Sequence, residues 1–566
     1  MNCSTRFKLT TVALLVGSAM NANAALYKVV EVDPALNGSS STYNDAYGVA
    51  IQQGDVAFET GCFANGANCT DDQFKLALET RVSVDGVSYR EELPFAMDAT
   101  FGYIQEFDDF ERYCYNELRY STCETWASIH WAPWYKELSK DYTSNALAFV
   151  ERDPDAGEEE PNAYQNKYNN VINSLTSSGL PVGNQSVLKD DKTDLETRNT
   201  VVAPVTPQGD FYQSRAWKTD GTYTVGSVSS KTGNENGTHY TSKAAIWDAA
   251  GVVKQLDWPQ VADRDGERLA QGSMRDVVVD STNNKVYGVG YNTYADDNYI
   301  NASVFVGTFD ASGTFENSRW DTKQVSGAQM KISGDIIHSN SVVTNVNSNF
   351  IAIGEAKRAG GKPSEGSAAN RLFLVKDVRA ESVSATFLPE LGGIFFSGAG
   401  GKMGGINKYN EIVGQLDAED TREIDGKPRR KRAFILPYEA NGSVESRISI
   451  FDNKAWYLDD LTNGSNAPVE NNQYRIIDAT DINDAGVISA TAIKCEGGYD
   501  TTAHNSYCGE GSKEETVVAV KLIPIADADA SNINTRPVEK AAAERSGAGL
   551  GWLSLTLLVL FGFRRK

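Results

Sequence analysis

The segment INKYNEIVGQ, residues 406–415, is a polar turn followed by an apolar strand that closes on a small residue, and it decides the fold because it recurs. Four other segments follow the same pattern: TDGTYTVGSV (219–228), NNKVYGVGYN (283–292), VNSNFIAIGEA (346–356) and INDAGVISATA (482–492). The closing residues lie 64, 64, 60 and 76 residues apart, at Gly226, Gly290, Gly354, Gly414 and Ala490. Such a period is typical of one repeated supersecondary unit.

Asn410 and Gly486 occupy matching turn positions in two of these units. Both residue types tolerate the left-handed backbone conformation that such turns need. A second strand follows each unit, at 242–248, 302–309, 371–377, 431–438 and 516–523, and a third follows some, at 252–258 and 455–461. The chain is therefore predicted to be all-β, built from repeated three- or four-stranded units.

One small sheet cannot bury both of its faces, so repeated sheets must pack on one another. The sequence predicts a β-propeller of about seven irregular blades over residues 25–525, with a β-solenoid or two sandwiches as alternatives. Residues 26–33 are expected to complete the last sheet and so close the ring. Earlier units fit the pattern less well, at 43–60, 98–107 and 145–153.

Two polar segments interrupt the pattern. Residues 154–200 are rich in Pro, Gly and Ser, and we expect a surface insertion or linker there, with one helix near 162–176. Residues 526–549 are expected to form a flexible spacer.

The first 24 residues have the features of a secretory signal peptide. A positive segment with Arg6 and Lys8 precedes a short apolar run, and an A-x-A motif ends at Ala24. Signal peptidase is therefore expected to leave Ala25 as the first mature residue. A transmembrane helix would need about 20 apolar residues, more than this run provides.

The C-terminal residues 550–566 form a short apolar segment that ends in three cations. As a helix, the 14 residues before those cations would reach about 21 Å, less than the hydrocarbon core of about 30 Å. Three small residues precede the segment and leave the backbone accessible to an intramembrane protease: Gly547, Ala548 and Gly549.

This tail resembles the GlyGly-CTERM sorting tail of Gram-negative bacteria. The resemblance implies transient anchoring in the inner membrane, removal by the intramembrane serine protease rhombosortase, and type II secretion to the cell surface or the medium. Gly547-Ala548-Gly549 departs from the adjacent glycines of that pattern and leaves the cleavage position open. The alternative is a plain single-pass anchor with the body in the periplasm.

The INxxxxIVG segment and the RAF motif at 432–434 resemble HAF-type repeats of uncharacterised extracellular bacterial proteins. Together with the tail, they make the chain similar to an exported Gram-negative family of unknown function. The repeat resemblance covers about residues 200–525 and implies no catalytic residues.

Removal of the signal peptide would take Cys3 away and leave six cysteines in three local couples: Cys62/Cys69, Cys114/Cys123 and Cys495/Cys508. An even number in an exported chain indicates disulfides. We expect pairing within each couple, because each couple brackets one loop. Zinc binding is the alternative, but paired C-x-x-C spacings are absent.

The chain carries 53 Lys and Arg against 75 Asp and Glu, a net charge of −22. A body this acidic repels phosphate backbones, so nucleic acid is not expected as a partner. The exception is the basic island RRKR at 429–432. It is expected to be a solvated loop or, alternatively, a contact for surface phosphates or for an acidic patch of another copy.

Aromatic residues are densest at 110–138, beside the Cys114/Cys123 couple. Aromatic planes on a rigid loop can stack on sugars or clasp a partner protein. The predicted binding residues are Trp126, His130, Trp131, Trp134 and Tyr135. The alternative is that these side chains only cap one end of the sheet assembly.

The four histidines, His130, His239, His338 and His504, show no metalloprotease spacing, and no nucleophile-elbow motif occurs, so no catalytic residue is predicted. Acidic segments at 153–160, 478–486 and 527–532 offer oxygen ligands for calcium. None of them forms a complete calcium loop, and solvated turns are the alternative. No other metal or cofactor is expected.

The leading hypothesis is a non-enzymatic exported β-repeat protein that binds a glycan or a surface protein, or serves as a scaffold. The alternatives are an extracellular hydrolase or lyase on the same scaffold, and a structural envelope protein.

Overall fold

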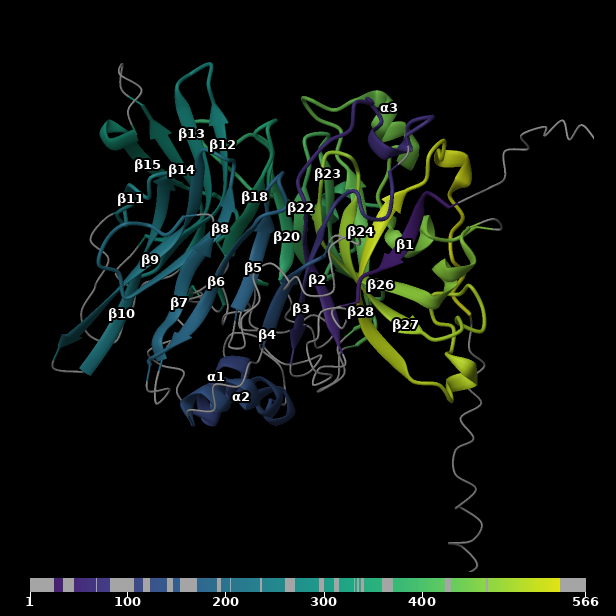
Figure 1. The fold of residues 1–566 in the computed structure, drawn as a ribbon, viewed down its shortest axis with the longest axis horizontal. Helices are drawn as coiled ribbons and strands as arrows, with labels where there is room; N and C mark the ends of the chain where they lie inside the picture. Colours follow the sequence, from purple (N-terminus) through teal and green to yellow (C-terminus); the bar gives the residue numbers. More distant parts are fainter. Residues whose placement is uncertain are drawn as a thin grey trace, which may run out of the picture.

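In the computed structural model, small antiparallel sheets follow one another along the chain (Figure 1). The structure describes residues 25–33, 45–67, 69–81, 106–115, 123–139, 146–152, 170–190, 195–203, 205–234, 237–259, 270–294, 300–309, 315–329, 331–332, 335–336, 341–358, 370–422, 429–464 and 467–539. The expected signal peptide with Ala24, the small residues Gly547, Ala548 and Gly549, and the tail at 550–566 lie outside these ranges. No helix in the described ranges is long and apolar enough to cross a membrane.

Within the described part of the chain, seven sheets have three or four strands and an eighth is a two-stranded hairpin. The first three sheets are β2 (Ala46–Ile51), β3 (Leu76–Arg81), β4 (Ala146–Val150); β5 (Asn170–Leu175), β6 (Pro181–Leu188), β7 (Leu195–Ala203); and β8 (Gln213–Thr219), β9 (Tyr223–Asn234), β10 (Gly237–Asp248), β11 (Val253–Gln255).

The fourth sheet is followed by the hairpin and then by the fifth sheet. These are β12 (Gly272–Asp280), β13 (Lys285–Thr293), β14 (Ile300–Thr308), β15 (Arg319–Gln324); β16 (Lys331–Ile332), β17 (Asp335–Ile336); and β18 (Ser341–Val346), β19 (Ala352–Ala356), β20 (Arg371–Val375), β21 (Thr386–Phe387).

The last two sheets are β22 (Gly401–Ile406), β23 (Glu411–Asp417), β24 (Lys431–Pro437), β25 (Trp456–Tyr457); and β26 (Tyr474–Ile482), β27 (Ile488–Cys495), β28 (Glu515–Pro524), β1 (Tyr27–Glu31). The helices described are α1 (Phe107–Tyr113), α2 (Glu124–Leu138), α3 (Glu445–Ile448) and α4 (Leu458–Leu461). Short 3₁₀ turns lie at Gly61–Phe63, Phe315–Asn317, Leu388–Leu391, Ser449–Phe451, Val469–Gln473, Gly509–Gly511 and Ala530–Asn532.

The five aligned runs became the second strands of five sheets, β9, β13, β19, β23 and β27. Their closing glycines face a β-bulge in the preceding strand. A Cβ on Gly290 would lie 1.9 Å from the Ser273 carbonyl oxygen, and one on Gly414 would lie 2.4 Å from that of Lys402. The glycine is therefore required by the close approach of backbone at the bulge.

The asparagine of the repeated turn connects neighbouring sheets. The Nδ2 group of Asn347 donates to the Asn407 carbonyl at 2.9 Å, that of Asn407 to the Asn483 carbonyl at 3.2 Å, and that of Asn483 to the Gln52 carbonyl at 3.0 Å. Each Oδ1 also accepts from main-chain N–H groups of its own turn. The expected left-handed turn conformation is confirmed, since φ is 65° at Asn410 and 91° at Gly486.

Each of the seven larger sheets contacts the next one along the chain, and the last sheet contacts the first through β2 and the strands β26, β27 and β28. The apolar core lies between consecutive sheets: for example, Val289 and Val304 of one sheet pack with Val343 and Phe373 of the next. β1 pairs antiparallel with β28, from Tyr27 opposite Pro524 to Glu31 opposite Val520. The prediction that residues 26–33 complete the last sheet is confirmed.

Three expectations need correction. The segment 154–200 was predicted as an insertion or linker with one helix near 162–176, but residues 170–175, 181–188 and 195–200 of it lie in the strands β5, β6 and β7. The aromatic stretch at 110–138, expected as a loop, contains the helices α1 and α2. Residues 526–539 of the predicted flexible spacer make defined contacts, because Arg536 is buried among polar partners.

Candidate functional site

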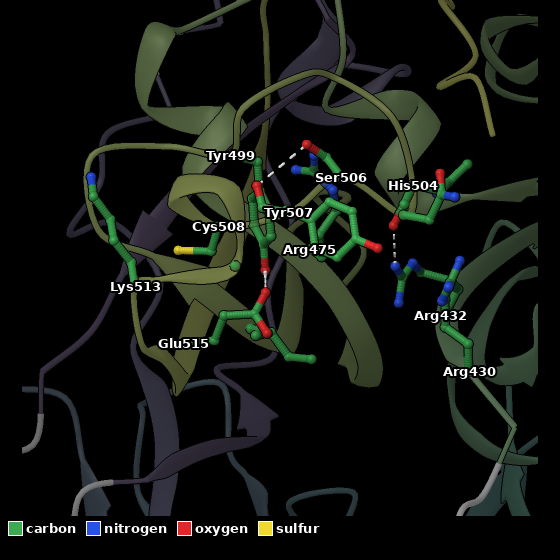
Figure 2. Close-up of a pocket in the computed structure, with 13 residues that line it drawn as sticks. Arg430, Arg432, Arg475, Tyr499, His504, Ser506, Tyr507, Cys508, Lys513 and Glu515 are labelled. Atoms are coloured by element: carbon green, nitrogen blue, oxygen red, sulfur yellow. Dashed lines mark hydrogen bonds between the residues drawn. The ribbon is translucent and has the colours of Figure 1, made fainter. Parts of the chain in front are cut away.

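A pocket of about 340 Å³ opens between the last two sheets and the loop that joins β27 to β28 (Figure 2). Most of its lining is polar or cationic. The lining residues are Arg430, Arg432, Arg475, Ile493, Tyr499, His504, Asn505, Ser506, Tyr507, Cys508, Gly511, Lys513 and Glu515. Figure 2 shows the two arginines Arg430 and Arg432 on one side, Lys513 on the other, and the tyrosines between them.

The Cys495–Cys508 disulfide and Arg475 hold the pocket loop in place. The Arg475 guanidinium donates to main-chain carbonyls of the loop, at 2.9 Å to Ala503 and 3.1 Å to Thr501. It also lies 4.0 Å from the centroid of the Tyr499 ring. Burial, and next the nearby Arg536, lower the pKa of Arg475 to about 10, so this side chain remains protonated at neutral pH. Its hydrogen-bonding groups are used inside the protein.

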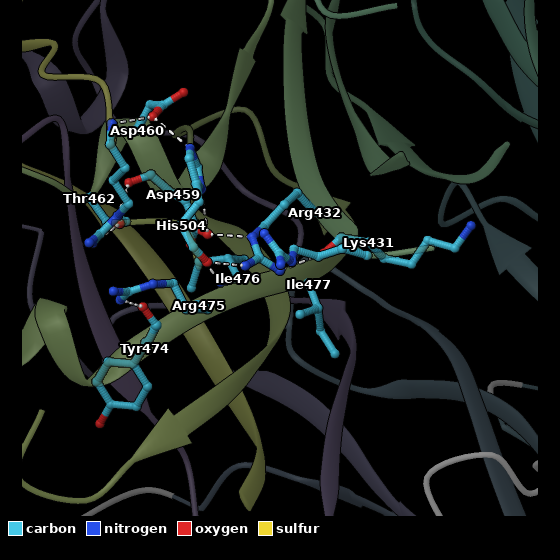
Figure 3. A network of polar contacts seen from close by, with 12 residues as sticks. Lys431, Arg432, Asp459, Asp460, Thr462, Tyr474, Arg475, Ile476, Ile477 and His504 are labelled. Atoms are coloured by element: carbon cyan, nitrogen blue, oxygen red, sulfur yellow. Dashed lines mark hydrogen bonds and ion pairs between the residues drawn. The ribbon is translucent and has the colours of Figure 1, made fainter. Parts of the chain in front are cut away.

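A buried polar network lies behind the pocket (Figure 3). Asp459 is 2.8 Å from Arg432 Nε and accepts a 2.7 Å hydrogen bond from the Ile476 N–H. Burial alone would raise the pKa of Asp459. The hydrogen bond with His504 and the charges of Arg432 and Arg536 outweigh burial and hold this pKa well below its usual value. Asp459 is therefore ionised over the whole physiological range.

His504 belongs to the same network and also lines the pocket. Its ring nitrogens lie 3.5 Å from Asp459 and 3.2 Å from Asp460, and its carbonyl accepts from Arg432 at 2.7 Å. Burial opposes the charged form of His504, but the hydrogen bonds to the two carboxylates raise its pKa above the usual value. The loop position of His504 is thus fixed by charge as well as by main-chain bonds.

A C-terminal strap, residues 533–539, is hydrogen-bonded to the pocket loop. The Arg536 N–H donates to Asp460 at 2.7 Å, and the Asn505 side chain exchanges two hydrogen bonds with the Glu539 main chain, each 2.8 Å. The His504 N–H donates to the Pro537 carbonyl at 2.9 Å. The strap therefore fixes the loop that forms one wall of the pocket.

The cations that face the pocket differ in how far they are neutralised. Arg430 is 35% exposed and pairs with the equally exposed Glu419 at 2.8 Å, and Lys513 is exposed and donates to the Glu496 carbonyl at 3.2 Å. Glu515 is the one carboxylate in the lining and accepts a 2.6 Å hydrogen bond from Tyr499. The pocket therefore has excess positive charge in a chain of net charge −22.

The basic island at 429–432 is not the solvated loop that the sequence predicted. Arg429 is buried and lies 3.2 Å from Asp417, and Lys431 pairs with the same carboxylate. Arg430 and Arg432 pair with acids of other segments, as given above. These partners were hidden from sequence reasoning because Asp417 and Asp459 lie outside the island.

The predicted aromatic residues lie elsewhere, on α2, and do not join the pocket. Phe110 packs near Trp126 and Trp131, with ring centroids 6.4 and 5.9 Å away, and Tyr135 is 56% exposed beside Trp131. The side chains of His130 and Trp134 lie outside what the structure describes. The described contacts are those of packing within a helical hairpin, and a binding role for it stays a prediction.

The three predicted disulfides are confirmed, as Cys62–Cys69, Cys114–Cys123 and Cys495–Cys508. They indicate an oxidising compartment, periplasmic or extracellular.

The described calcium candidates use their carboxylates internally: Asp481 accepts from the Ile51 N–H at 3.2 Å, and Asp529 accepts from the Ser531 N–H at 2.8 Å. Segment 153–160 lies outside the described residues. In the part of the chain that is described, no three His, Cys, Asp or Glu residues are grouped to hold a metal ion.

The fold and the pocket define a β-repeat protein of an oxidising compartment, with a cation-lined pocket on its last two sheets. The chain belongs to the family DUF3466, a protein family of unknown function, whose model matches residues 4–206 and 210–566. No curated protein matches the chain.

Two solved structures show a weak likeness. A complex of BT0996 with RGII has 11% identity and a TM-score of 0.23, with 60% of this chain and 94% of that protein covered. The Bombyx mori GH32 beta-fructofuranosidase BmSUC1 has 10% identity and a TM-score of 0.22, with 89% and 91% covered. Likeness at this level supports no conclusion about fold or function.

Proposed function

We propose that this protein is an exported binding module whose pocket holds an anionic ligand. The observation that carries the proposal is the lining itself, which has four Lys and Arg side chains against one carboxylate in a strongly acidic chain. A volume of about 340 Å³ falls at the lower end of the usual range for small-molecule sites, about 300–1,000 Å³. The rigid disulfide-linked wall keeps the entropy cost of binding small.

The scaffold of the proposed module is a propeller with seven blades. Support comes from the cyclic order of sheet contacts and from β1, which completes the last sheet. A ring of this kind leaves no sheet without neighbours on both sides, which removes the packing problem of a single small sheet.

Export in this proposal depends on both chain ends. Signal peptidase cleaves after Ala24, and the tail at 550–566 anchors the chain until a rhombosortase-type protease removes it for type II secretion. Support comes from the disulfides and from the residue pattern of the two ends. A plain membrane anchor in the periplasm is the competing arrangement.

A hydrolase or lyase is the second candidate, because Tyr499 and Glu515 face the same pocket at 2.6 Å. Burial, and next the hydrogen bond to Glu515, raise the pKa of Tyr499 well above its usual value. The phenol therefore stays protonated and is a poor general base at neutral pH. The protonated phenol therefore favours binding over catalysis, and a purely structural envelope role is the third option.

Isothermal titration of the purified full chain tests the proposed function. The probes are galacturonate, glutamate, inorganic sulfate and inorganic phosphate, with glucose as the uncharged reference. We expect at least one anion to bind, and Lys513→Ala to weaken that binding about tenfold, the effect of about 1.4 kcal/mol. Lys454→Ala, which removes an exposed lysine elsewhere, is the matched control and should change nothing. Binding of no anion, or equal binding of glucose, would overturn the proposal.

A further inference from the structure

We infer that the ligand of this pocket is a carboxylated sugar, a uronic-acid residue of an acidic polysaccharide, with its ring against Tyr507 and its carboxylate at Arg430. The inference rests on the proposed function and names its substrate class. Four features of the pocket support it.

The first feature is the tyrosine face. Tyr507 is 62% exposed although it lines the pocket, and it sits next to Cys508, so the disulfide limits its movement. A rigid aromatic plane buries large contact area at little entropy cost. An exposed flat face in a polar pocket fits the face of a sugar ring.

The second feature is the small share of aliphatic lining. Ile493 is the one aliphatic side chain among the lining residues, and the rest offers hydrogen-bonding groups such as the Ser506 hydroxyl and the Glu515 carboxylate. The Glu515 carboxylate can only accept when ionised, so it suits a ligand rich in hydroxyl donors. An acidic peptide offers one backbone N–H donor per residue, whereas a sugar ring offers several hydroxyl donors to the same carboxylate.

The third feature separates a carboxylate from phosphate or sulfate. Sites for those anions often present a run of unused backbone N–H groups. In the pocket loop several of those groups are used internally: the Tyr499 N–H donates to Asn472, the Asp500 N–H to Tyr507, and the Gly511 N–H to Cys508. What remains is side-chain charge, and a planar carboxylate of the ligand would take the place of Glu419 on the Arg430 guanidinium, which is 35% exposed.

The fourth feature is the balance of charge within the pocket. Asp459 neutralises Arg432. A ligand with a second negative group would place that group near Glu515, which would repel it. A ligand with one charge per ring therefore fits better than a dianion. The charge of −22 is spread over the whole chain, and beyond about 8 Å it is largely screened at physiological salt. The electrostatic potential that a ligand meets inside the pocket is therefore set mainly by the cations of the lining.

The test uses the full chain and a pair of probes that differ only in charge: an oligogalacturonate and its fully methyl-esterified form. We expect the acid form to bind at least about tenfold more tightly than the ester. Arg430→Gln should reduce this preference, Tyr507→Ala should weaken binding of both forms about tenfold, and Tyr507→Phe should keep most of the affinity. Arg430 is partly exposed and Tyr507 is exposed, and unchanged thermal unfolding of each variant verifies that it has folded.

Further arms separate the possible failures. If sulfate, phosphate or a poly-glutamate peptide binds in a Lys513-dependent way and oligogalacturonate does not, the uronic-acid inference is wrong and the proposed anion site stands. If no anion binds, both are wrong. Equal affinity of the acid and the ester, with loss in Tyr507→Ala, would mean a neutral-sugar site and would overturn both statements about charge.

Discussion

The repeated asparagine turns of the sheets and the pocket on the last two sheets both depend on buried polar groups. The two regions differ in where those polar groups come from in the sequence. In the turns, the same asparagine recurs, and Asn347, Asn407 and Asn483 each donate to the next sheet. In the pocket, Arg475 and Asp459 each occur once, with partners drawn from several segments. The scaffold follows a repeated local rule, whereas the site depends on contacts that occur only here.

This difference predicts where substitutions act. Changes at the repeated turns and bulges should lower the stability of the whole protein. Changes at the rim of the pocket should lower binding and leave the fold intact. Three measurements of stability test these expectations, two on the repeated sheets and one on the polar network behind the pocket.

The largest effect is expected at Arg447, which is fully buried and forms a bidentate pair with Glu411, at 2.6 and 2.8 Å. Arg447→Met leaves the Glu411 carboxylate buried without its cation. The free energy of unfolding should fall by about 3–5 kcal/mol, the usual result of breaking a buried pair. Urea denaturation measures it. Lys454→Met, in an exposed pair with Asp452, is the control and should cost less than about 1 kcal/mol. If both variants lost the same unfolding free energy, burial of the Arg447–Glu411 pair would not be the cause of the loss.

A smaller loss is expected at the bulge. Gly290→Ala places a methyl group against the Ser273 carbonyl and should cost about 1–3 kcal/mol, the range for an overpacked core. The matching position in the last sheet already holds Ala490, which is fully buried, so Ala490→Gly should cost about 0.5–1 kcal/mol or slightly more. Chemical denaturation of the pair compares the two sheets. If the Gly290→Ala protein had unchanged stability, the backbone at the bulge could move away from the new methyl group at no cost, and glycine would not be needed there.

The smallest effect is expected at His504, and it should depend on pH. The folded-state pKa is raised, so the stabilisation from the charged ring is complete below its ordinary pKa of about 6.5 and is lost as pH rises through the raised value. Wild type should exceed His504→Gln in unfolding free energy by about 1 kcal/mol at low pH, with a shrinking difference above neutrality. Urea denaturation over a pH series measures the difference, and one that grows with pH would contradict the assigned network.

Much of the scaffold could be predicted from the sequence, because a small residue closes the aligned strand of all five repeats and asparagine recurs at one turn position in four of them. The strands β5, β6 and β7 were missed, since they bury polar side chains. Asn170 is fully buried and exchanges two hydrogen bonds with the Ala148 main chain, and Asn184 bonds the Ser214 carbonyl. In the sequence, asparagines such as these are typical of loops, so the strands that contain them were not recognised.

The pocket could not be predicted, because its walls come from residues near 430, 475 and 493–515. Two local features pointed toward it: the Cys495/Cys508 couple and the isolated basic island at 429–432. Neither reveals that Asp459 pairs with Arg432 or that the strap at 533–539 is hydrogen-bonded to the loop. Those contacts exist only after distant segments have folded together.

The pairing of β1 with β28 has a mechanical consequence. β28 lies inside its sheet, hydrogen-bonded to β27 on one side and β1 on the other. A pulling force applied at the C-terminal end would reach β28 through the strap and load two rows of hydrogen bonds in shear at once. The protein should therefore resist traction from that end more strongly than traction on β1, an edge strand held by one row.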